Sequence, residues 1–555
     1  MATAALPRTV IQPRSGIMEW LTTVDHKKIG LLYIVMGFLF FLSGGIMALL
    51  IRLELAAPGG QIVSAQTYNT LFTMHGTTMI FLFVIPMSVG FGNYLVPLMI
   101  GARDMAFPRL NAFSFWLALG GGIIMYSSML VIGPEAGWTG YSPLANSIFS
   151  KSPGTDLWIM GLVVIGTSSL VGAINFIVTI LNMRTPGMTM TRIPLFCWSM
   201  LTTSVMILAS TPVLAGALIM LFFDRNFGTS FFSGPGSDSA MYQHMFWFYS
   251  HPAVYIMVLP AMGIVSEVIP VFSRKPIFGY KAIAYSTAAI ALFGFLVWAH
   301  HMFTTGLAPV LQVFFMAVTM AIAIPTGVKI FNWIATMWHG RLRLDTAMLN
   351  VFGFLTMFVI GGISGVFNAV VPIDYQVQDT YFVVAHLHYV LFGGSVFGIF
   401  AGMYYWIPKI FGFMMNEKLG KLQFWIMLFG FNLTFFPMHL LGLEGMPRRI
   451  YDYAPSRGWA PLNGLATIGS WFIALSVLIF IINFIVSQRK NVAAGNDPWE
   501  GNTLEWATSS PPPSYNFKTV LPVYSERPVR DARVAAQMAA QDAQQQKAAE
   551  PQAAA

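Results

Sequence analysis

Twelve long apolar segments run through this 555-residue sequence and restrict it to very few folds. A helix needs about 20 residues to cross the hydrocarbon core of a bilayer, and each segment is near or above that length. Only 9% of the residues are charged and 56% are hydrophobic, which is unlike a soluble protein. We therefore predict an all-α polytopic membrane protein with twelve transmembrane helices in one bundle. The segments cover approximately residues 29–50, 68–100, 112–133, 157–183, 195–223, 241–272, 281–305, 309–338, 347–371, 381–411, 421–442 and 462–487.

The distribution of basic residues predicts the orientation of these segments. Lysine and arginine gather before the first segment, in the loops after even-numbered segments, and after the last one, whereas the opposite loops are poorer apart from Arg448 and Arg449. The positive-inside rule then predicts that both termini are cytoplasmic. Much of the net charge of +8 lies in these loops, so it indicates topology and not nucleic-acid binding. The loop residues are Arg8, Arg14, Lys27, Lys28, Arg103, Arg109, Arg184, Arg192, Arg274, Lys275, Arg341, Arg343, Lys418, Lys421, Arg489 and Lys490.

The chain divides into three regions by composition. Residues 1–28 are predicted to form a cytoplasmic segment at the membrane surface, residues 29–487 the membrane domain, and residues 488–555 a cytoplasmic Pro-rich and low-complexity tail. The Pro-rich stretch 509–514 is incompatible with regular helix. Residues 544–551 are low in complexity and are expected to be disordered, although a helix around 528–548 remains open. No cleavable signal is predicted, because the first apolar run is too long for one.

The tenth segment carries two histidines, His386 and His388, within Tyr381-Phe-Val-Val-Ala-His-Leu-His-Tyr-Val390. Ionisable groups at membrane depth are costly and usually mark functional sites. At about 100° per residue on a helix, positions i and i+2 point in nearly opposite directions. One metal is therefore not easily held by both, whereas two metals can flank the helix. The alternative is a pair of core histidines satisfied by neighbouring helices.

Three more histidines lie on the sixth and seventh segments. His251 and Tyr255 are four residues apart and so share one helix face. His300 and His301 are adjacent, so both reach one metal only if the helix passes close to it. A site of three imidazoles suits copper or zinc, with iron also possible. Each histidine alone could be a core residue, but three on consecutive segments favour a metal site.

A sixth histidine, His75, begins the second segment within Phe72-Thr-Met-His75-Gly. The adjacent glycine suits close approach of a flat macrocycle. His75 can pair with His386 or His388 as the two axial ligands of a low-spin haem, and the other would bind a second haem with an open position. The single cysteine, Cys197, excludes a Cys-x-x-Cys-His attachment, so any haem is held by axial ligands and packing.

Several motifs together resemble subunit I of the haem–copper oxidases, specifically the cytochrome c oxidases, over about residues 20–520. They are Phe91-Gly-Asn-Tyr-Leu-Val-Pro, Ile100-Gly-Ala-Arg-Asp-Met-Ala-Phe-Pro-Arg-Leu-Asn, Trp298-Ala-His-His-Met-Phe, Ile324-Pro-Thr-Gly-Val-Lys, Gly445-Met-Pro-Arg-Arg and Asp497-Pro-Trp-Glu-Gly-Asn-Thr-Leu-Glu-Trp. The resemblance implies a bacterial inner-membrane enzyme that reduces dioxygen to water and pumps protons. It also implies ligands for two haems, expected to be of the a type, and for one copper. These are His75 and His388 for the low-spin haem, His386 for the high-spin haem, and His251, His300 and His301 for copper.

The resemblance also implies a reactive tyrosine and a proton route that ends at it. Tyr255 would be joined covalently to His251 and would supply an electron and a proton when the dioxygen bond breaks. Lys329 lies mid-helix in the eighth segment, where a lysine is more often functional than structural, although snorkelling to an interface is the alternative. With Thr326 and Ser266 it would form a route to Tyr255.

A second implied proton route begins at an aspartate, Asp104. Its polar residues are Asn93, Asn111, Asn175, Ser168 and Ser169. The sequence departs from the commonest family pattern here, because Ala253 stands where many relatives carry a membrane glutamate. Tyr249 and Ser250 precede His251 instead, which resembles the branch that uses a Tyr-Ser pair. Since Tyr249 is four residues before Ala253, its hydroxyl can occupy similar space.

Further residues would contact the haems or an outer metal ion. Arg52 would contact a haem formyl group, with interfacial snorkelling as the alternative. Arg448 and Arg449 suit anions because guanidinium groups bind carboxylates in pairs, and with Trp138 they would lie near haem propionates. Gln378 and Asp379 occupy the place of a His-Asp pair that binds magnesium in relatives, and the glutamine puts that ion in question.

Four functions are compatible with the sequence to different degrees. The motifs favour a cytochrome c oxidase over the other three. A quinol oxidase of the ubiquinol branch would carry charged residues in the first helix, where this chain has Ser43-Gly-Gly-Ile-Met47. A nitric oxide reductase would lack the equivalents of Tyr255 and Lys329. A metal-free transporter would use the histidines as proton relays. The expected partners are subunit II, which carries the electron-entry copper site because no thiolate pair exists here, subunit III, cytochrome c, dioxygen and membrane lipid, with no nucleic acid.

Overall fold

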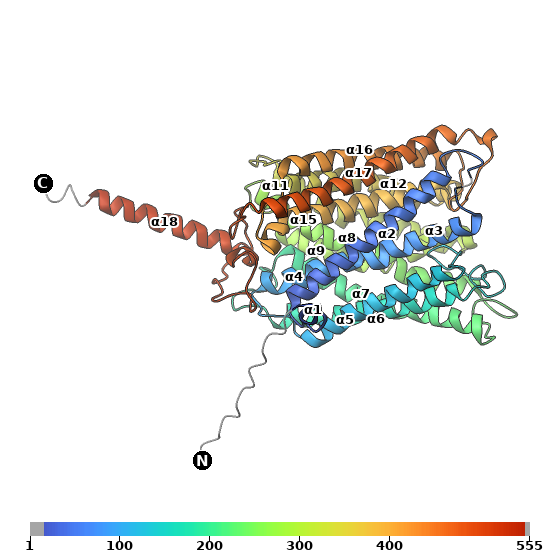
Figure 1. The fold of residues 1–555 in the computed structure, drawn as a ribbon, viewed down its shortest axis with the longest axis horizontal. Coiled ribbons are helices and arrows are strands. Elements are labelled where there is room, and N and C mark those ends of the chain that lie inside the picture. Colours follow the sequence, from blue (N-terminus) through green and yellow to red (C-terminus); the bar gives the residue numbers. More distant parts are fainter. Residues whose placement is uncertain (1–15, 61, 550–555) are drawn as a thin grey trace, which may run out of the picture.

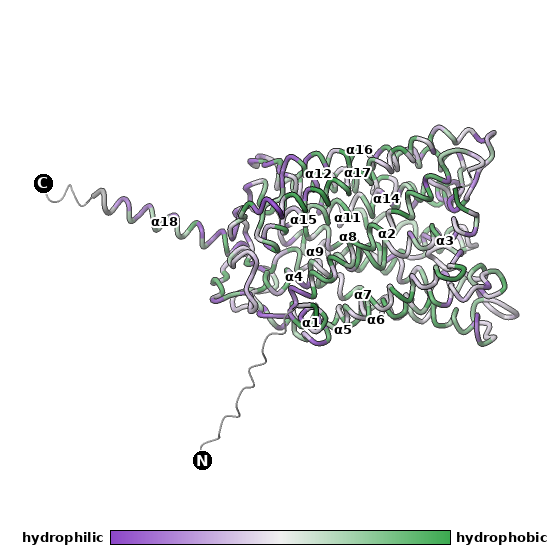
Figure 2. The backbone as a smooth tube through the Cα atoms, viewed as in Figure 1, coloured by the Kyte–Doolittle hydropathy of each residue, from purple (hydrophilic) through white to green (hydrophobic). Residues whose placement is uncertain are grey.

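The computed structural model describes residues 16–60 and 62–549, which form a bundle of long helices (Figure 1). Twelve of the helical spans in these residues are long and apolar enough to cross a membrane, so the predicted number is confirmed. The first described helix and the last one lie at the same end of the bundle (Figure 1). Figure 2 shows hydrophobic backbone through the middle of the bundle and hydrophilic backbone gathered towards both ends.

The helices follow one another along the chain with short connections. Their bounds are α1 Ile17–Leu21, α2 His26–Glu54, α3 Ala65–Thr77, η1 Thr78–Val84, α4 Ile85–Ile100, α5 Pro108–Ser127, η2 Ser128–Leu130, α6 Gly154–Asn182, α7 Leu195–Asn226, α8 Ser239–Phe272, α9 Tyr280–Gly294, η3 Trp298–Thr305, α10 Pro309–Ala321, α11 Ala323–Met337, α12 Thr346–Ala369, α13 Val371–Val377, α14 Tyr381–Val390, η4 Leu391–Val396, α15 Phe397–Phe411, α16 Glu417–Leu443, η5 Pro455–Arg457, α17 Ala460–Lys490, η6 Leu504–Ala507 and α18 Pro528–Ala549.

Most helices extend a few polar residues beyond the apolar segments that predict them. Helix α16 begins at Glu417 because the side chain of Asn416 accepts a hydrogen bond from the Leu419 amide. Helix α2 begins at His26, because Asp25 caps it by accepting from the Lys27 amide. Helix α2 therefore begins inside the segment 1–28 that was predicted to lie at the membrane surface, and both His26 and Lys27 are buried.

Four of the predicted spans are not continuous α-helices. The seventh span leaves α-helical geometry after Gly294 and continues as the 3₁₀ helix η3. The second and tenth spans contain the π-helical turns η1 and η4. The eighth divides at Ile322 between α10 and α11. Hydrophobicity predicts the length of a span but not its pitch, and such irregular turns are frequent at functional sites.

The first part of the tail packs against the bundle. Trp499, Leu504 and Trp506 are buried, and the buried Lys409 on α15 donates to the carbonyl oxygen of Thr508 at 2.7 Å. The expected disorder from residue 544 is wrong up to Ala549, since α18 continues to that residue, and residues 550 and 551 lie outside the described residues. The Pro-rich stretch contains no helix, as predicted.

Candidate active site

A cavity of about 1010 Å³ lies inside the bundle and is lined by all six of the histidines singled out from the sequence. They come from four elements, namely α3, α8, η3 and α14. Other predicted residues that line the same cavity are Arg52, Trp138, Tyr255, Thr326, Gln378, Arg448 and Arg449. The predicted site residues of six separate spans therefore meet in one place.

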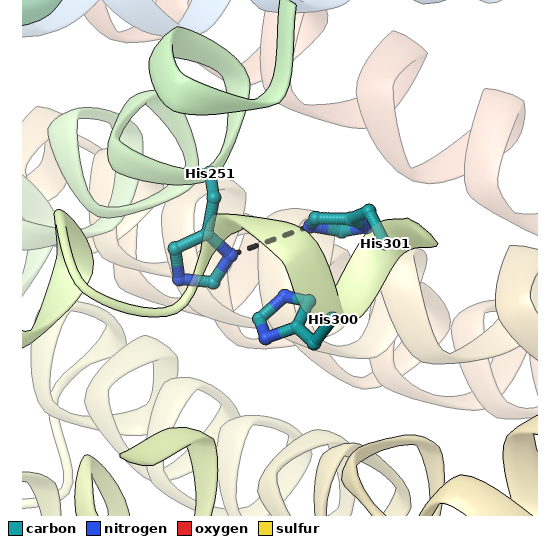
Figure 3. A group of neighbouring side chains, drawn as sticks. All are labelled: His251, His300 and His301. Atoms are coloured by element: carbon teal, nitrogen blue, oxygen red, sulfur yellow. Dashed lines mark hydrogen bonds between the residues drawn. The ribbon is translucent and has the colours of Figure 1, made fainter. Parts of the chain in front are cut away.

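His251, His300 and His301 form a close cluster (Figure 3). One ring nitrogen from each lies within 4.8 Å of the others, and Nδ1 of His251 is 3.3 Å from Nε2 of His301. Among the described residues this is the one group of three or more His, Cys, Asp or Glu side chains found at such a spacing. Figure 3 shows the adjacent pair on η3 turned towards His251 on α8, so the tight 3₁₀ turn allows both rings to reach one point.

Two residues that the sequence reasoning missed contact this cluster. The indole of Trp247 stacks on the His301 ring with centroids 3.7 Å apart and planes 11° apart. The Thr319 hydroxyl lies 2.9 Å from Nδ1 of His300. Such neighbours orient metal-ligating imidazoles. Trp247 is one helical turn before His251, which is a usable signal, but nothing near Thr319 in the sequence points to its role.

Tyr255 lies beside His251, as the four-residue spacing predicts. Their ring centroids are 4.9 Å apart, and the tyrosine ring lines the cavity. Nε2 of His251 is buried and has no hydrogen-bond partner. The two rings are therefore close enough for direct interaction, and one histidine nitrogen remains free for it.

The rings of His75 and His388 face each other across the cavity. Their centroids are 6.3 Å apart and their planes differ by 12°. Nδ1 of His75 lies 2.9 Å from the Gly44 carbonyl and Nδ1 of His388 lies 2.8 Å from the Val384 carbonyl. A carbonyl only accepts, so each Nδ1 donates and each Nε2 keeps a lone pair for a metal. The centroid separation fits one metal between two imidazoles, given metal–nitrogen bonds of about 2.0 Å.

His386 projects from α14 in a different direction from His388, as the two-residue spacing predicts. Its Nδ1 lies 3.0 Å from the Gly361 carbonyl and 3.0 Å from the Ser364 hydroxyl, both on α12. Its Nε2 is again left as a ligand atom. The ring of Phe435 stacks on His388 with centroids 4.2 Å apart, which holds that imidazole on the opposite side of α14.

The arginines at the cavity have unequal partners. Nη2 of the buried Arg52 donates to Asn463, while Nε and Nη1 have no partner. Nε of Arg448 donates to Asp379 at 2.6 Å. Nη2 of Arg449 donates to the Thr139 hydroxyl at 3.2 Å, and burial lowers the pKa of Arg449 to about 10. Buried cationic nitrogens at a cavity wall are suited to an anionic or carbonyl group of a ligand.

The structure gives another reason for the glycine after His75. A Cβ at Gly76 would lie 3.1 Å from Cβ of Trp138, so this glycine lets α3 approach the tryptophan closely. The proposed close approach of a macrocycle is therefore not the only constraint on Gly76, although the residue also lines the cavity.

Of the two residues expected at an outer magnesium, Gln378 lines the cavity, whereas the Asp379 side chain is largely exposed. The Asp379 carboxylate is paired with Arg448, and Gln378 caps the short helix α13. Nearby Asp374, which the sequence reasoning missed, is buried with Oδ2 unpartnered. Burial and the neighbouring Asp379 raise the pKa of Asp374 to about 7.

The lysine expected in the first proton route is buried between helices and does not reach an interface. Nζ of Lys329 donates to the Thr287 hydroxyl at 2.5 Å, a contact that the sequence reasoning missed. Ser266 accepts from Nε1 of Trp333 at 3.0 Å. Thr326 lines the main cavity together with Tyr255. Lys329 forms no direct hydrogen bond with Ser266 or Thr326, so any route through the three needs water between them.

The residues expected in the second proton route come from α4, α5, α6, α8 and the loop between α4 and α5. A small cavity of about 30 Å³ is lined by Ser168, Ser169 and Tyr33, and the Tyr33 hydroxyl lies 3.4 Å from that of Ser168. Tyr33 was not predicted. Nearer the end that holds both described termini, Asn175 bonds both backbone groups of Phe107. Burial raises the pKa of Asp104 to about 6.

Several polar groups along this second set of residues lack partners. Oδ1 of Asn93 and Nδ2 of Asn111 are buried and unbonded, and so is the Ser250 hydroxyl. The Tyr249 ring is buried and lies parallel to Phe81, with centroids 6.1 Å apart. Buried unpaired polar atoms of this kind commonly hold water.

A model of the family described as "Cytochrome C and Quinol oxidase polypeptide I" matches residues 28–496 of the chain. The chain belongs to this family. Cytochrome c oxidase subunit 1 of Thermostichus vulcanus is 54% identical over 507 residues, covering 91% of both chains. The protein of the same name from Synechocystis sp. is 55% identical over 93% of this chain and 94% of the relative. That from Bacillus subtilis is 50% identical over 91% and 81%, respectively.

A solved structure of a haem–copper terminal oxidase dimer has the same fold. The TM-score is 0.71 with 19% sequence identity, over 83% of this chain and 84% of the other. The predicted all-α, twelve-helix fold class is therefore confirmed. As a member of this oxidase family the chain is a catalytic, multi-pass oxidase subunit that uses haem and copper, pumps protons and works with partners such as subunit II. The family description includes quinol oxidases, so it leaves the electron donor open.

Proposed function

We propose that this chain reduces dioxygen to water with electrons from cytochrome c, in a bacterial inner membrane, with both termini in the cytoplasm. One observation carries the assignment of its centre. A parallel imidazole pair, a three-imidazole cluster and a sixth histidine on the intervening helix line one cavity. The basic loops at the end that holds both described termini support the orientation.

His75 and His388 would hold the low-spin haem, His386 the high-spin haem, and His251, His300 and His301 the copper. When bound, these groups supply electron transfer and the reduction of dioxygen. The free Nε2 atoms and the cavity volume support the fit. The two unpartnered guanidinium nitrogens of Arg52 support a haem with a formyl group, hence the a type, and Arg448, Arg449 and Trp138 would contact propionates.

Tyr255 would hold and deliver a proton at its hydroxyl oxygen. Its ring lies against His251, whose Nε2 is unpartnered, which supports the covalent link between the two side chains. The three-histidine cluster lies among membrane-spanning helices, so each proton consumed there must arrive along polar side chains and water. Ser266, Lys329 and Thr326 would supply Tyr255 from the cytoplasmic side.

Lys329→Met should reduce turnover by about 100-fold or more, because it removes a proton carrier from an otherwise apolar stretch. Steady-state oxygen consumption measures the loss, and unchanged haem absorption shows that the centre is intact. Thr287→Val is a companion variant, since it removes the one hydrogen bond that the Lys329 ammonium makes to the described residues, and it is expected to have a smaller effect. Normal turnover of Lys329→Met would contradict this route.

The second route would run from Asp104 through Asn93, Asn111, Asn175, Ser168 and Ser169 to Tyr249 and Ser250. Its support is the small cavity that Ser168 and Ser169 line, together with the unpartnered buried polar groups. Ala253 cannot carry a proton, so a hydroxyl near it is needed to connect this route to the centre.

Tyr249→Phe is expected to lose most turnover or most proton pumping, because the hydroxyl replaces a carboxylate in the route. Oxygen consumption and proton release from reconstituted vesicles measure the two effects separately. Tyr126→Phe is a matched control, since that hydroxyl lies elsewhere and bonds Ser43. A Tyr249→Phe oxidase that pumps normally would exclude the role.

The partner subunits follow from what the chain lacks and from its family. Its one cysteine cannot form a dinuclear copper entry site, so subunit II would bring the electrons from cytochrome c, and subunit III would complete the complex. A magnesium ion at Gln378 and Asp379 would compete with Arg448 for the same carboxylate, and we do not assign one.

A reduced-minus-oxidised spectrum of the purified complex, with haem extraction and copper analysis, tests the proposal. We expect two haems of the a type and one copper in this subunit, and oxidation of cytochrome c in preference to a quinol. Absence of haem bands would contradict the oxidase centre. Oxidation of quinol but not cytochrome c would contradict only the donor.

A further inference from the structure

The tail that follows the last membrane helix contacts the loop that carries Asp104. Asn516 follows the Pro-rich stretch and is fully buried. Its Nδ2 donates to the carbonyl of Ala102 at 2.9 Å and lies 3.3 Å from that of Arg103. These two carbonyls immediately precede Asp104. A residue more than 400 positions away in the chain therefore anchors this loop.

The same amide also joins the start of the first membrane helix. Oδ1 of Asn516 accepts from Nζ of Lys27 at 3.0 Å, and Nδ2 lies 2.9 Å from Nε2 of His26. Nδ1 of His26 is 2.6 Å from the Asn93 carbonyl, which only accepts, so Nδ1 donates and Nε2 of the neutral ring accepts from Asn516. The orientation of the amide follows, and all its donors and its acceptor have partners.

The backbone at this position further restricts the residue. Asn516 has a φ of +69°, a left-handed conformation that asparagine adopts more readily than most residues. Its carbonyl accepts from the Thr508 hydroxyl at 2.5 Å, and its amide donates to the Pro513 carbonyl at 3.0 Å. The Pro-rich turn is thus folded so that one side chain reaches between α2 and the Asp104 loop.

The opposite end of the loop is held by α6. The Ala106 amide donates to the Thr179 hydroxyl at 2.9 Å, and the Phe107 amide donates to Oδ1 of Asn175 at 3.0 Å. Asp104 lies between this attachment and the one made by Asn516. Loss of the Asn516 attachment would free the loop on the side of the carboxyl group.

We infer that Asn516 is a positioning residue that fixes the Asp104 loop at the entrance of the second proton route. The C-terminal tail is then part of the proton-uptake surface. This inference rests on the proposed role of Asp104. This role also explains why the tail is buried against the bundle at Asn516. The catalytic centre itself does not require that contact.

The charged surroundings of Asp104 predict how the loop affects proton uptake. Burial raises the pKa of Asp104, and the groups that face it are Asp25, Lys27 and His26. If the loop loosens, the carboxyl becomes hydrated and its pKa falls towards the ordinary value. A lower pKa means that Asp104 loses its proton at lower pH, so the alkaline decline of turnover should move to lower pH.

Asn516→Gly in the complete oxidase complex tests the inference, because glycine adopts positive φ but has no amide side chain. We expect turnover to fall about tenfold. We also expect fewer protons pumped per electron and an alkaline decline shifted to lower pH, with haem and copper content unchanged. Asn516→Asp, which cannot donate to the Ala102 and Arg103 carbonyls, should behave in the same way.

Trp499→Phe is the matched control, since it removes a different tail contact, from Nε1 to the Tyr405 carbonyl at 2.9 Å. It should pump normally with an unchanged pH profile. A Trp499→Phe defect equal to that of Asn516→Gly would overturn the inference in favour of general tail stability. Normal pumping and a normal pH profile in Asn516→Gly would also overturn the inference.

Asp104→Asn separates the inference from the proposed route. Loss of pumping in Asp104→Asn would support the route even if Asn516→Gly were normal. Normal pumping in Asp104→Asn would overturn both the route and the role of Asn516.

Discussion

Replacement of Tyr255 by phenylalanine is expected to abolish turnover while both haem signals and the copper content persist. The substitution removes one buried hydroxyl and keeps the ring that lies 4.9 Å from His251. A positioned proton donor contributes about 10²- to 10⁴-fold to a rate, and Tyr255 would also supply an electron, so we expect a loss at the upper end of this range. Of the three described tyrosines that line the cavity, Tyr255 is the one whose ring packs against a histidine of the cluster.

Oxygen consumption with reduced cytochrome c measures this loss, and the reduced-minus-oxidised spectrum shows that the centre has assembled. Mass spectrometry of digested wild-type protein adds an independent readout, because the peptides of His251 and Tyr255 should appear joined and should not be joined in the variant. Tyr126→Phe controls for the removal of a partly buried tyrosine hydroxyl elsewhere in the bundle. Turnover within a few fold of wild type in Tyr255→Phe would remove this residue from the mechanism.

Loss of one imidazole of the cluster is expected to have a comparable effect for a different reason. His301→Asn would leave His251 and His300, two ligands where three lie within 4.8 Å. Two imidazoles bind copper far more weakly than three arranged around one point. The variant should therefore lose its copper and its turnover, and it should keep both haems, since neither the His75–His388 pair nor His386 is altered.

Copper analysis of the purified complex measures this directly, and the haem spectrum reports assembly of the remaining centre. His339→Asn is a matched control, because His339 is exposed and has a φ of +57° that asparagine tolerates. It should retain copper and turnover. Full copper content in His301→Asn would show that the three-histidine cluster is not the copper site.

The sequence alone predicts the features that depend on a single helix, namely its length and the relative directions of its side chains. Apolar length predicts each of the twelve spans, because the thickness of the bilayer sets it. The two-residue spacing of His386 and His388 predicts that they diverge, and the four-residue spacing of His251 and Tyr255 predicts that they meet. Each of these relations depends on the pitch of a single helix, so no partner segment is needed to infer it.

Other features depend on contacts between distant segments and left no pattern in the sequence. Thr319 contacts His300, and Thr287 contacts Lys329, across helix interfaces. The change to 3₁₀ geometry at η3, which brings His300 and His301 to one point, arises in an apolar run that looks like any other span. The contribution of a threonine or of a local change in pitch is determined by what packs against it.

The tail illustrates the same division most clearly. Its proline content correctly excludes helix at residues 509–514, because proline lacks the amide hydrogen that a helix requires. Nothing in the tail sequence indicates that Asn516 is buried between α2 and the Asp104 loop, where every polar atom of its amide finds a partner. Helical pitch and bilayer thickness act within a few residues or a single span and can be inferred from the order of amino acids. The hydrogen-bond partners of buried polar groups come from distant segments of the chain. Only the tertiary structure shows which of these segments meet.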